Sequence, residues 1–345
     1  MKKLYIVLPL VFAAVLNAQE KGFTPSGKFS GLMFGDYFYD ADQHDASKKD
    51  FNGFQFRRIY LTHDYNIAAD FATRFRLEAD QSALTSNGKT GVYVKDAYLH
   101  WKNVFQGSDL VFGVSSTPAY DFSEEAWGYR SLEKTIMDLR GIVPSRDLGI
   151  DLKGNLDNEG SVKYWLKFAN NSGNSPESDK FKRYYGNLQF KVASGLQVLL
   201  YGDYDTRANK LDAVGGQMKS NSRITFAGFV NLASKNECSL GVEGYYQTIQ
   251  NSFRSTPTAA LEDQKNYGVT VFAWYALRSD FRFVGRYDIY DPNTSVNKDG
   301  INLLILALDY LPAKNVHVMP NLSLQTYQAG GSNDVVPRVT FYYVF

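Results

Sequence analysis

The sequence has no apolar run long enough to cross a membrane as a helix. Such a helix needs about 18 or more consecutive apolar residues, and the longest candidate, Ile301 to Leu311, is interrupted by Asn302 and Asp309. Cysteine is nearly absent, and the single Cys238 cannot form an intramolecular disulfide, which excludes a small secreted fold held by disulfides. The 37 basic and 36 acidic residues nearly cancel, so the charge balance gives no support for nucleic-acid binding.

Patterns that would carry chemistry are also missing. None of the four histidines lies in a nucleophile motif, and Gly-x-Ser-x-Gly does not occur. The run Asp291 to Asp299 spaces oxygen-bearing side chains two residues apart, as a calcium loop does, but Val296 stands where such a loop needs glycine. No glycine loop follows a strand and opens a helix to cradle a phosphate. We therefore expect a protein that is not an enzyme and that needs neither a metal nor a cofactor.

The first residues of the sequence show a pattern that is typical of exported proteins. Lys2 and Lys3 precede the apolar run Leu4 to Leu16, and the small residue Ala18 precedes Gln19. This three-part arrangement is typical of a secretory signal peptide, and its apolar run is too short to span a bilayer. We expect residues 1–18 to be the signal peptide and residues 19–345 to form the mature protein outside the cytoplasm.

Alternation with a period of two dominates the rest of the chain. In the segment 70–80, apolar side chains such as Phe75 and Leu77 alternate with charged ones such as Arg76 and Glu78. A helix would mix these two sets, whereas a strand separates them. The alternation predicts sixteen strands, an even number as in bacterial single-chain barrels. They lie near residues 27–39, 53–65, 70–80, 92–102, 109–114, 147–154, 160–169, 182–192, 195–205, 221–231, 237–248, 266–277, 280–290, 300–311, 314–327 and 335–345.

The connections between these strands alternate in length. Tight links lie at residues 66–69, 193–194, 232–236, 278–279 and 312–313. Longer polar connections lie at residues 40–52, 81–91, 170–181, 206–220, 249–265 and 291–299. Short turns at one end and long loops at the other are typical of an outer-membrane barrel. No alternation of helices with strands favours an α/β enzyme.

The two faces of the expected strands differ in chemistry. Val162, Tyr164 and Leu166, for example, alternate with Lys163 and Lys167. A membrane barrel turns its apolar face to lipid and its polar face to a lumen. Aromatic residues repeat at strand ends, which suits the interfacial girdles of a membrane protein. The sequence therefore predicts an all-β fold, a transmembrane antiparallel β-barrel in the cell outer membrane.

Several short motifs occur in an order that is shared with a known group of barrels. Phe54 to Leu61 contains paired arginines, and Phe75 to Asp80 and Val94 to Leu99 follow it as two further strands. The run Arg146 to Ile150 closes the long segment that follows the fifth strand, and the chain ends in the aromatic Tyr343-Val344-Phe345. In these motifs the chain resembles the phosphate-selective porin O/P-like family of outer-membrane porins, over nearly the whole mature length.

The resemblance implies a sixteen-stranded barrel, a homotrimer and a long third loop folded into the pore. It also implies contact with outer-membrane lipid and, through Phe345, with the outer-membrane assembly machinery. Phosphate-selective members carry a lysine cluster in the channel, whereas the nearest lysines here, Lys48, Lys49, Lys180 and Lys182, lie in or beside expected loops. Phosphate selectivity is therefore not part of the prediction.

The segment Ser115 to Arg146 is the longest stretch without the period of two. Loops of this length inside a compact domain are commonly functional, and its interleaved charges suit a constriction with a transverse field. A solvated extracellular loop would carry the same charges equally well. Residues 131–139 could form a helical turn or two. The candidate constriction residues are Asp121, Glu124, Glu125, Arg130, Arg140 and Arg146.

Charged residues on the expected lumen side would supply the opposite wall of a pore. Eleven basic positions face the lumen against eight acidic ones, an excess that would draw anions inward in a narrow lumen. Pairing between neighbouring strands, as of Arg282 or Arg286 with Asp288, would cancel part of it. The candidate pore-lining residues on the wall are Arg58, Arg74, Arg76, Glu78, Arg282, Arg286 and Arg338.

Two functions from different classes fit these features. The first is a porin for passive diffusion of small polar solutes or ions, with a weak preference for anions. The alternative is a structural or adhesive barrel that does not conduct and binds a partner through its long loops. Barrels of about eight strands are filled by side chains, whereas sixteen strands leave an aqueous channel, which favours the porin.

Overall fold

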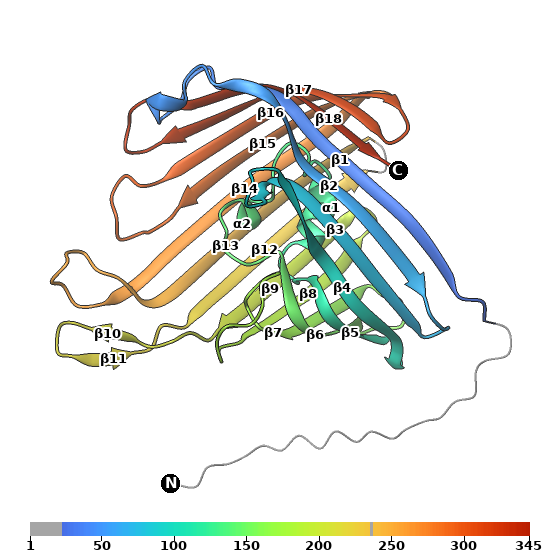
Figure 1. Cartoon of the computed structure of the whole chain (residues 1–345), viewed down its shortest axis with the longest axis horizontal. Coiled ribbons are helices and arrows are strands. Elements are labelled where there is room, and N and C mark those ends of the chain that lie inside the picture. The colour runs from blue at the N-terminus through green and yellow to red at the C-terminus, as the bar shows by residue number, and fades with distance from the viewer. Residues whose placement is uncertain (1–22, 235–236) are drawn as a thin grey trace, which may run out of the picture.

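Sixteen antiparallel strands close into a barrel in which β1 pairs with both β2 and β18 (Figure 1). The structure is a computed structural model that describes residues 23–234 and 237–345, apart from the side chains at 82 and 83. The expected signal peptide lies outside the described residues. Within them, the predicted fold class is confirmed, including the number of strands.

Each strand expected from the alternation is present. The barrel strands are β1 (Ser26–Tyr39), β2 (Asn52–Asn66), β3 (Phe71–Leu84), β4 (Thr90–Phe105), β5 (Ser108–Ser116), β6 (Arg146–Asn155), β7 (Val162–Ala169), β8 (Arg183–Ala193), β9 (Leu196–Asp205), β12 (Arg223–Ser234), β13 (Cys238–Phe253), β14 (Glu262–Arg278), β15 (Phe281–Asp291), β16 (Ile301–Ala313), β17 (Val316–Tyr327) and β18 (Asp334–Val344). The connections hold a 3-10 turn (Ala46–Lys48), α1 (Asp121–Trp127), α2 (Ile136–Leu139) and the two short strands β10 (Lys210–Asp212) and β11 (Gln217–Lys219). No helix among the described residues has the length and hydropathy to cross a membrane.

The outer face of the barrel is a band of exposed apolar side chains. Phe75 is 45% exposed, Leu166 51% and Val242 42%, although each lies within a barrel strand and not in a loop. The charged neighbours Arg76 and Lys167 point to the other side, where they form ion pairs. Apolar residues outside and hydrogen-bonded polar residues inside are what a bilayer requires of a closed sheet. The chain is therefore a transmembrane barrel of the outer membrane.

The two ends of the barrel differ in the length of their connections, as predicted. At one end the turns are tight, and Gly195 between β8 and β9 has φ 78°. A Cβ on Gly195 would lie 2.2 Å from the carbonyl oxygen of Ala233, so only glycine fits this turn. Following the orientation of outer-membrane barrels, the short-turn end faces the periplasm and the long-loop end faces outward.

Three long connections differ from their predicted bounds. Pairing of Leu84 with Thr90 extends β3 and β4, so the loop expected at residues 81–91 shrinks to residues 85–89. Pairing of Phe253 with Glu262 similarly shortens the loop expected at residues 249–265. The loop expected at residues 206–220 contains the β10–β11 hairpin, in which Leu211 pairs with Met218. In these three places the strands remain paired beyond the lipid-facing apolar band. The lipid-facing pattern of apolar residues does not extend that far, so the sequence does not indicate the additional pairing.

Candidate functional site

Residues 117–145, here called the inner loop, lie inside the barrel and carry both helices (Figure 1). Trp127 and Ile136 are fully buried, and Leu132 and Met137 are 1% exposed. They pack against inward-facing side chains of distant strands in one hydrophobic cluster. The wall side of this cluster consists of Ala169, Tyr185, Leu199, Tyr201, Phe229, Tyr245, Phe272, Val284, Leu303, Ile305, Ala307 and Met319.

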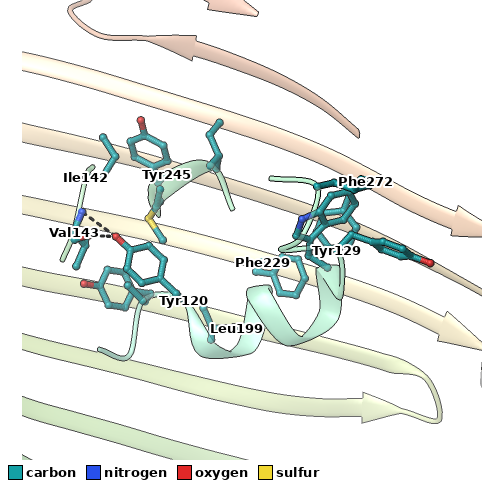
Figure 2. Close-up of a cluster of buried hydrophobic side chains, with 14 of the residues drawn as sticks. Tyr120, Tyr129, Ile142, Val143, Leu199, Phe229, Tyr245 and Phe272 are labelled. Carbon is teal, nitrogen blue, oxygen red and sulfur yellow. Dashed lines mark hydrogen bonds between the residues drawn. The ribbon is translucent and has the colours of Figure 1, made fainter. Parts of the chain in front are cut away.

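The cluster has two centres, one at each helix (Figure 2). Next to α1, the Trp127 ring centroid lies 5.0 Å from that of Phe272. Next to α2, the hydroxyl of Tyr120 donates to the carbonyl oxygen of Val143 and accepts a hydrogen bond from its backbone amide, which closes the base of the loop. The inner loop is therefore held by its own core rather than by a few surface contacts.

Polar side chains from several walls bind the backbone of the inner loop. Arg57 of β2 donates to the carbonyl oxygens of Ser131 and Leu132, the latter at 3.0 Å. Arg286 of β15 donates to the carbonyl oxygen of Lys134. On β16, Asp309 accepts a hydrogen bond from the Tyr129 hydroxyl at 3.0 Å, and on β13 Gln247 donates to the carbonyl oxygen of Ile142 at 3.2 Å. These contacts place the loop across the lumen from its origin at β5 and β6.

The wall that the inner loop leaves uncovered carries a group of ion pairs on β2, β3, β4 and β6. The Glu78 carboxylate accepts from Arg58 Nε at 2.7 Å and lies 2.8 Å from Lys95 Nζ. The Asp96 carboxylate accepts from Arg146 Nε at 2.5 Å and lies 3.1 Å from Arg76 Nη1. We call these six residues the wall cluster. Glu78 and Asp96 are 1% and 2% exposed, so the carboxylates lie behind the cations that they hold.

Two β-bulges add cations at positions that would face the lipid if the alternation were strict. Between β1 and β2, Phe34 pairs with Arg58 and Gly35 pairs with Phe56, which leaves Arg57 unpaired at the bulge. Between β3 and β4 the register skips Lys95 in the same way. A bulged residue leaves the strict alternation and re-aims its side chain, so Arg57 and Lys95 point inward beside residues that also point inward. A prediction from strict alternation does not place either side chain inside the barrel. The sequence indicates the bulges only by two adjacent pairs of charged residues, at 57–58 and 95–96.

The inner loop presents carboxylates toward the wall cluster. Arg130 binds Glu124 at 3.1 Å and Asp138 at 2.8 Å, which joins α1 to α2. Asp121 and Glu124 line the same cavity as Arg58, Arg76 and Arg146 of the wall. This space, the arginine cavity, has a volume of about 540 Å³.

Glu133 lies on the inner loop between the two helices. Its side chain accepts a hydrogen bond from the backbone amide of Lys134 at 2.9 Å. Burial alone would raise the pKa of Glu133, but the positive charge of Arg57 and the Lys134 amide together hold this pKa below its usual value. Glu133 is therefore ionised at neutral pH, and the positive charge of Arg57 on β2 stabilises this ionised form.

Eight of the predicted pore residues line the arginine cavity, and the others lie elsewhere. The eight are Arg58, Arg74, Arg76, Asp121, Glu124, Glu125, Arg130 and Arg146. Glu78 lies behind them in the wall, and Arg286 binds the inner loop and Asp288. Arg140 lies over the Tyr290 ring, and Arg338 of β18 pairs in register with Asn321, so neither joins the group. Arg282 lines a second cavity.

This second cavity, the lower chamber, lies on the short-turn side of the inner loop and has a volume of about 650 Å³. Its wall residues come from strand ends beside tight turns, such as Lys163 of β7 and Arg282 of β15. Glu125, Gly128, Ser131 and Tyr342 line both cavities, so the two adjoin. No group of three or more metal-ligating side chains occurs within residues 23–234 and 237–345.

No protein-family model matches this chain. A search of curated protein sequences also finds no match.

Solved structures match over nearly the whole length. The outer membrane channel DcaP of Acinetobacter baumannii superposes with a TM-score of 0.69 at 14% identity, covering 95% of this chain and 99% of that one. The anion-selective porin from Comamonas acidovorans gives 0.65 at 14% identity, covering 93% and 100%. OmpT of Vibrio cholerae, an outer-membrane protein, gives 0.64 at 13% identity, covering 95% and 100%. The chain thus has the fold of outer-membrane porins, while membership of the phosphate-selective family stays a prediction.

Proposed function

We propose that this chain is an outer-membrane porin for passive diffusion of small polar solutes or ions, with a weak preference for anions. The observation that carries the proposal is the arginine cavity, where wall arginines face carboxylates of a loop held inside the barrel. A solute that passes this place meets opposite charges on opposite sides. Such a field orients polar molecules and slows apolar ones. No chemical step is involved, so the proposal includes no catalytic residue and no cofactor.

The preference for anions follows from which groups reach the cavity. Five arginines line it against the three carboxylates Asp121, Glu124 and Glu125. Each of these arginines is ion-paired, for example Arg74 with Asp64 at 2.6 Å, so the preference depends on which groups line the cavity and not on a net excess of positive charge. We therefore expect a weak preference rather than selectivity for one anion. The lysine cluster of phosphate-selective porins has no counterpart here, and we do not extend the proposal to phosphate.

The proposal includes the assembly that the fold suggests. The exposed apolar band would contact outer-membrane lipid, and the C-terminal Phe345, whose backbone pairs with Gly31, would serve the assembly machinery as its signal. A homotrimer is expected, and a trimer form of the similarly folded OmpT of Vibrio cholerae has been solved. Chemical crosslinking of the protein in native outer membranes tests this part directly.

One observation favours the alternative, a barrel that is structural or adhesive and does not conduct. The inner loop fills much of the lumen with an apolar core, as a plug would. Swelling of liposomes that contain the purified barrel separates the two functions, because arabinose-sized solutes enter only through an open pore. Swelling supports the porin, and its absence supports the plugged barrel.

Planar-bilayer recordings test the selectivity. Under a gradient of potassium chloride, the reversal potential should correspond to chloride permeating slightly better than potassium. Replacing chloride by phosphate should lower the current without blocking it at low concentration. A reversal potential of the opposite sign would contradict the anion preference, and no current at all would contradict the porin.

A further inference from the structure

The lower chamber differs from the arginine cavity in how its positive charges are balanced. Every arginine of the arginine cavity is bound to a carboxylate, as Arg58 is to Glu78 and Arg76 is to Asp96. In the lower chamber, Lys163 has neither an ion pair nor a side-chain hydrogen bond to any residue that the structure describes. A smaller cavity of about 90 Å³ adjoins it at Lys163 and adds Lys191, whose ammonium group is equally unpaired within the described chain.

Arg282 is the cation on the other wall of the lower chamber. Its register partner on β16 is Asp309, but that carboxylate is engaged by His317 Nδ1 at 2.9 Å and by the Tyr129 hydroxyl at 3.0 Å. The guanidinium instead lies over the Trp274 ring, 4.9 Å from its centroid. None of the ion pairs within the described residues includes Arg282, whose side chain also hydrogen-bonds Tyr129, so its charge lies over an aromatic face without a carboxylate partner.

The remaining lining of the lower chamber suits the body of an organic molecule. Phe122, Trp274 and Tyr342 line it as half-buried rings, and the amides of Gln189 and Gln197 lie on the wall of Lys163. Glu125 is the only carboxylate among the described lining residues. An anionic group gains from the unpaired cations, and a flat or apolar body gains from the rings.

We propose that the lower chamber is a binding site for small organic anions in which a carboxylate or phosphate group is joined to a ring. Arg282 binds the anionic group, with Trp274 and Tyr342 beside the ring, and Lys163 adds positive potential from the other wall. The inference deepens the proposed porin and rests on it in one respect, since solutes reach the chamber through the same lumen. It places the anion-binding step on the periplasmic side of the inner loop and not at the arginine cavity.

Isothermal titration calorimetry on the purified, full-length barrel tests the site with three probes. Benzoate has a ring and a negative charge, acetate has the charge without the ring, and benzylamine has the ring with a positive charge. We expect benzoate to bind most tightly, acetate more weakly and benzylamine not at all. Equal affinities for benzoate and benzylamine would overturn the anion site, and equal affinities for benzoate and acetate would overturn the ring as part of the ligand.

Matched variants locate the binding. Arg282→Gln should weaken benzoate roughly tenfold, as expected on losing a charge-assisted hydrogen bond, and Lys163→Gln should weaken it less. Arg278→Gln and Lys314→Gln serve as controls, because both residues are exposed in neighbouring tight turns and line neither cavity. Equal affinities in Arg282→Gln and Arg278→Gln would overturn the assignment to Arg282.

Bilayer currents separate this inference from the porin itself. If benzoate binds through Arg282 but the barrel carries no current, the site stands and the porin fails. If the barrel conducts but benzoate neither binds nor reduces the current, the porin stands and the site fails. If both hold, benzoate should reduce the current more strongly from one side of the membrane than from the other.

Discussion

Ile136 of α2 packs into the space above Gly268 of β14. A Cβ placed on Gly268 would lie 2.8 Å from Cδ1 of Ile136 and 2.5 Å from the Tyr245 ring. The glycine therefore determines how closely α2 approaches the wall. Since Ile136 is fully buried, the fit at this contact helps to fix the position of the whole inner loop.

We expect Gly268→Val to displace the inner loop. The added side chain overlaps Ile136 and Tyr245, which should cost about 1–3 kcal/mol of stability and change the single-channel conductance. Gly244→Val is the control, because a Cβ there meets no atom closer than 3.9 Å. Unchanged conductance and thermal midpoint in Gly268→Val, relative to Gly244→Val, would show that this contact does not position the loop.

The loop carboxylates should limit the preference for anions. In the double variant Asp121→Asn/Glu124→Gln, two negative charges leave the arginine cavity and Arg130 loses one of its two partners. We expect the chloride-to-potassium permeability ratio, measured from the reversal potential, to rise about two- to fivefold, since charges in a narrow lumen act at reduced dielectric. Glu159→Gln, in an exposed turn, should leave the ratio unchanged. An unchanged ratio would place these carboxylates outside the path of the ions.

Arg57 should serve both the wall and the inner loop. Its Nε lies 2.8 Å from the carboxylate of Asp36, which is fully buried. Arg57→Gln leaves that charge unpaired, at a cost of about 3–5 kcal/mol, and also removes the donors to Ser131 and Leu132. In Arg57→Gln/Asp36→Asn the thermal midpoint should recover, while current fluctuations from the untethered loop should remain. If the current of the double variant fluctuates no more than that of the wild type, the hydrogen bonds of Arg57 do not hold the inner loop in place.

Acid should loosen the inner loop through Glu133. The pKa of this carboxyl is lowered in the folded protein by Arg57 and the Lys134 amide, against the effect of burial. A lowered pKa means that the stabilisation is present above the unfolded value of about 4.3 and is lost as the pH falls through the folded value. Current noise should therefore increase in acid in the wild type, and Glu133→Gln should show that noise already at neutral pH. Identical pH profiles for the two proteins would rule out this contact.

The sequence alone predicts the barrel well because lipid imposes a strict alternation on each strand. Phe75 and Arg76 show it, and the structure places them on opposite faces as expected. The bulges at Arg57 and Lys95 break the alternation locally, and pairing register depends on contacts between strands that one sequence does not display.

The sequence predicted the position of the inner loop only in part. Its length and mixed charges pointed to a constriction, but its apolar partners sit at lumen-facing positions, where polar residues were expected. β16 shows the overlooked signal: Leu303, Ile305 and Ala307 face inward while Leu306 and Leu308 face outward, so both faces are apolar. A strand that is apolar on both faces inside a polar lumen indicates that something covers it. Which loop covers it follows only from the three-dimensional arrangement.

The inner loop also constrains how the barrel is made. Tyr129 and its hydrogen-bond partner Asp309 are separated by 180 residues, and the apolar partners of Trp127 lie on strands far downstream of it. Contacts between such distant parts of a chain form late, because the intervening chain must be ordered first. Before β12 to β16 have paired, the apolar side chains of the inner loop are exposed. Exposed apolar surface promotes aggregation or binding by chaperones. The core of the inner loop can therefore be completed only after the distant strands that cover it have paired.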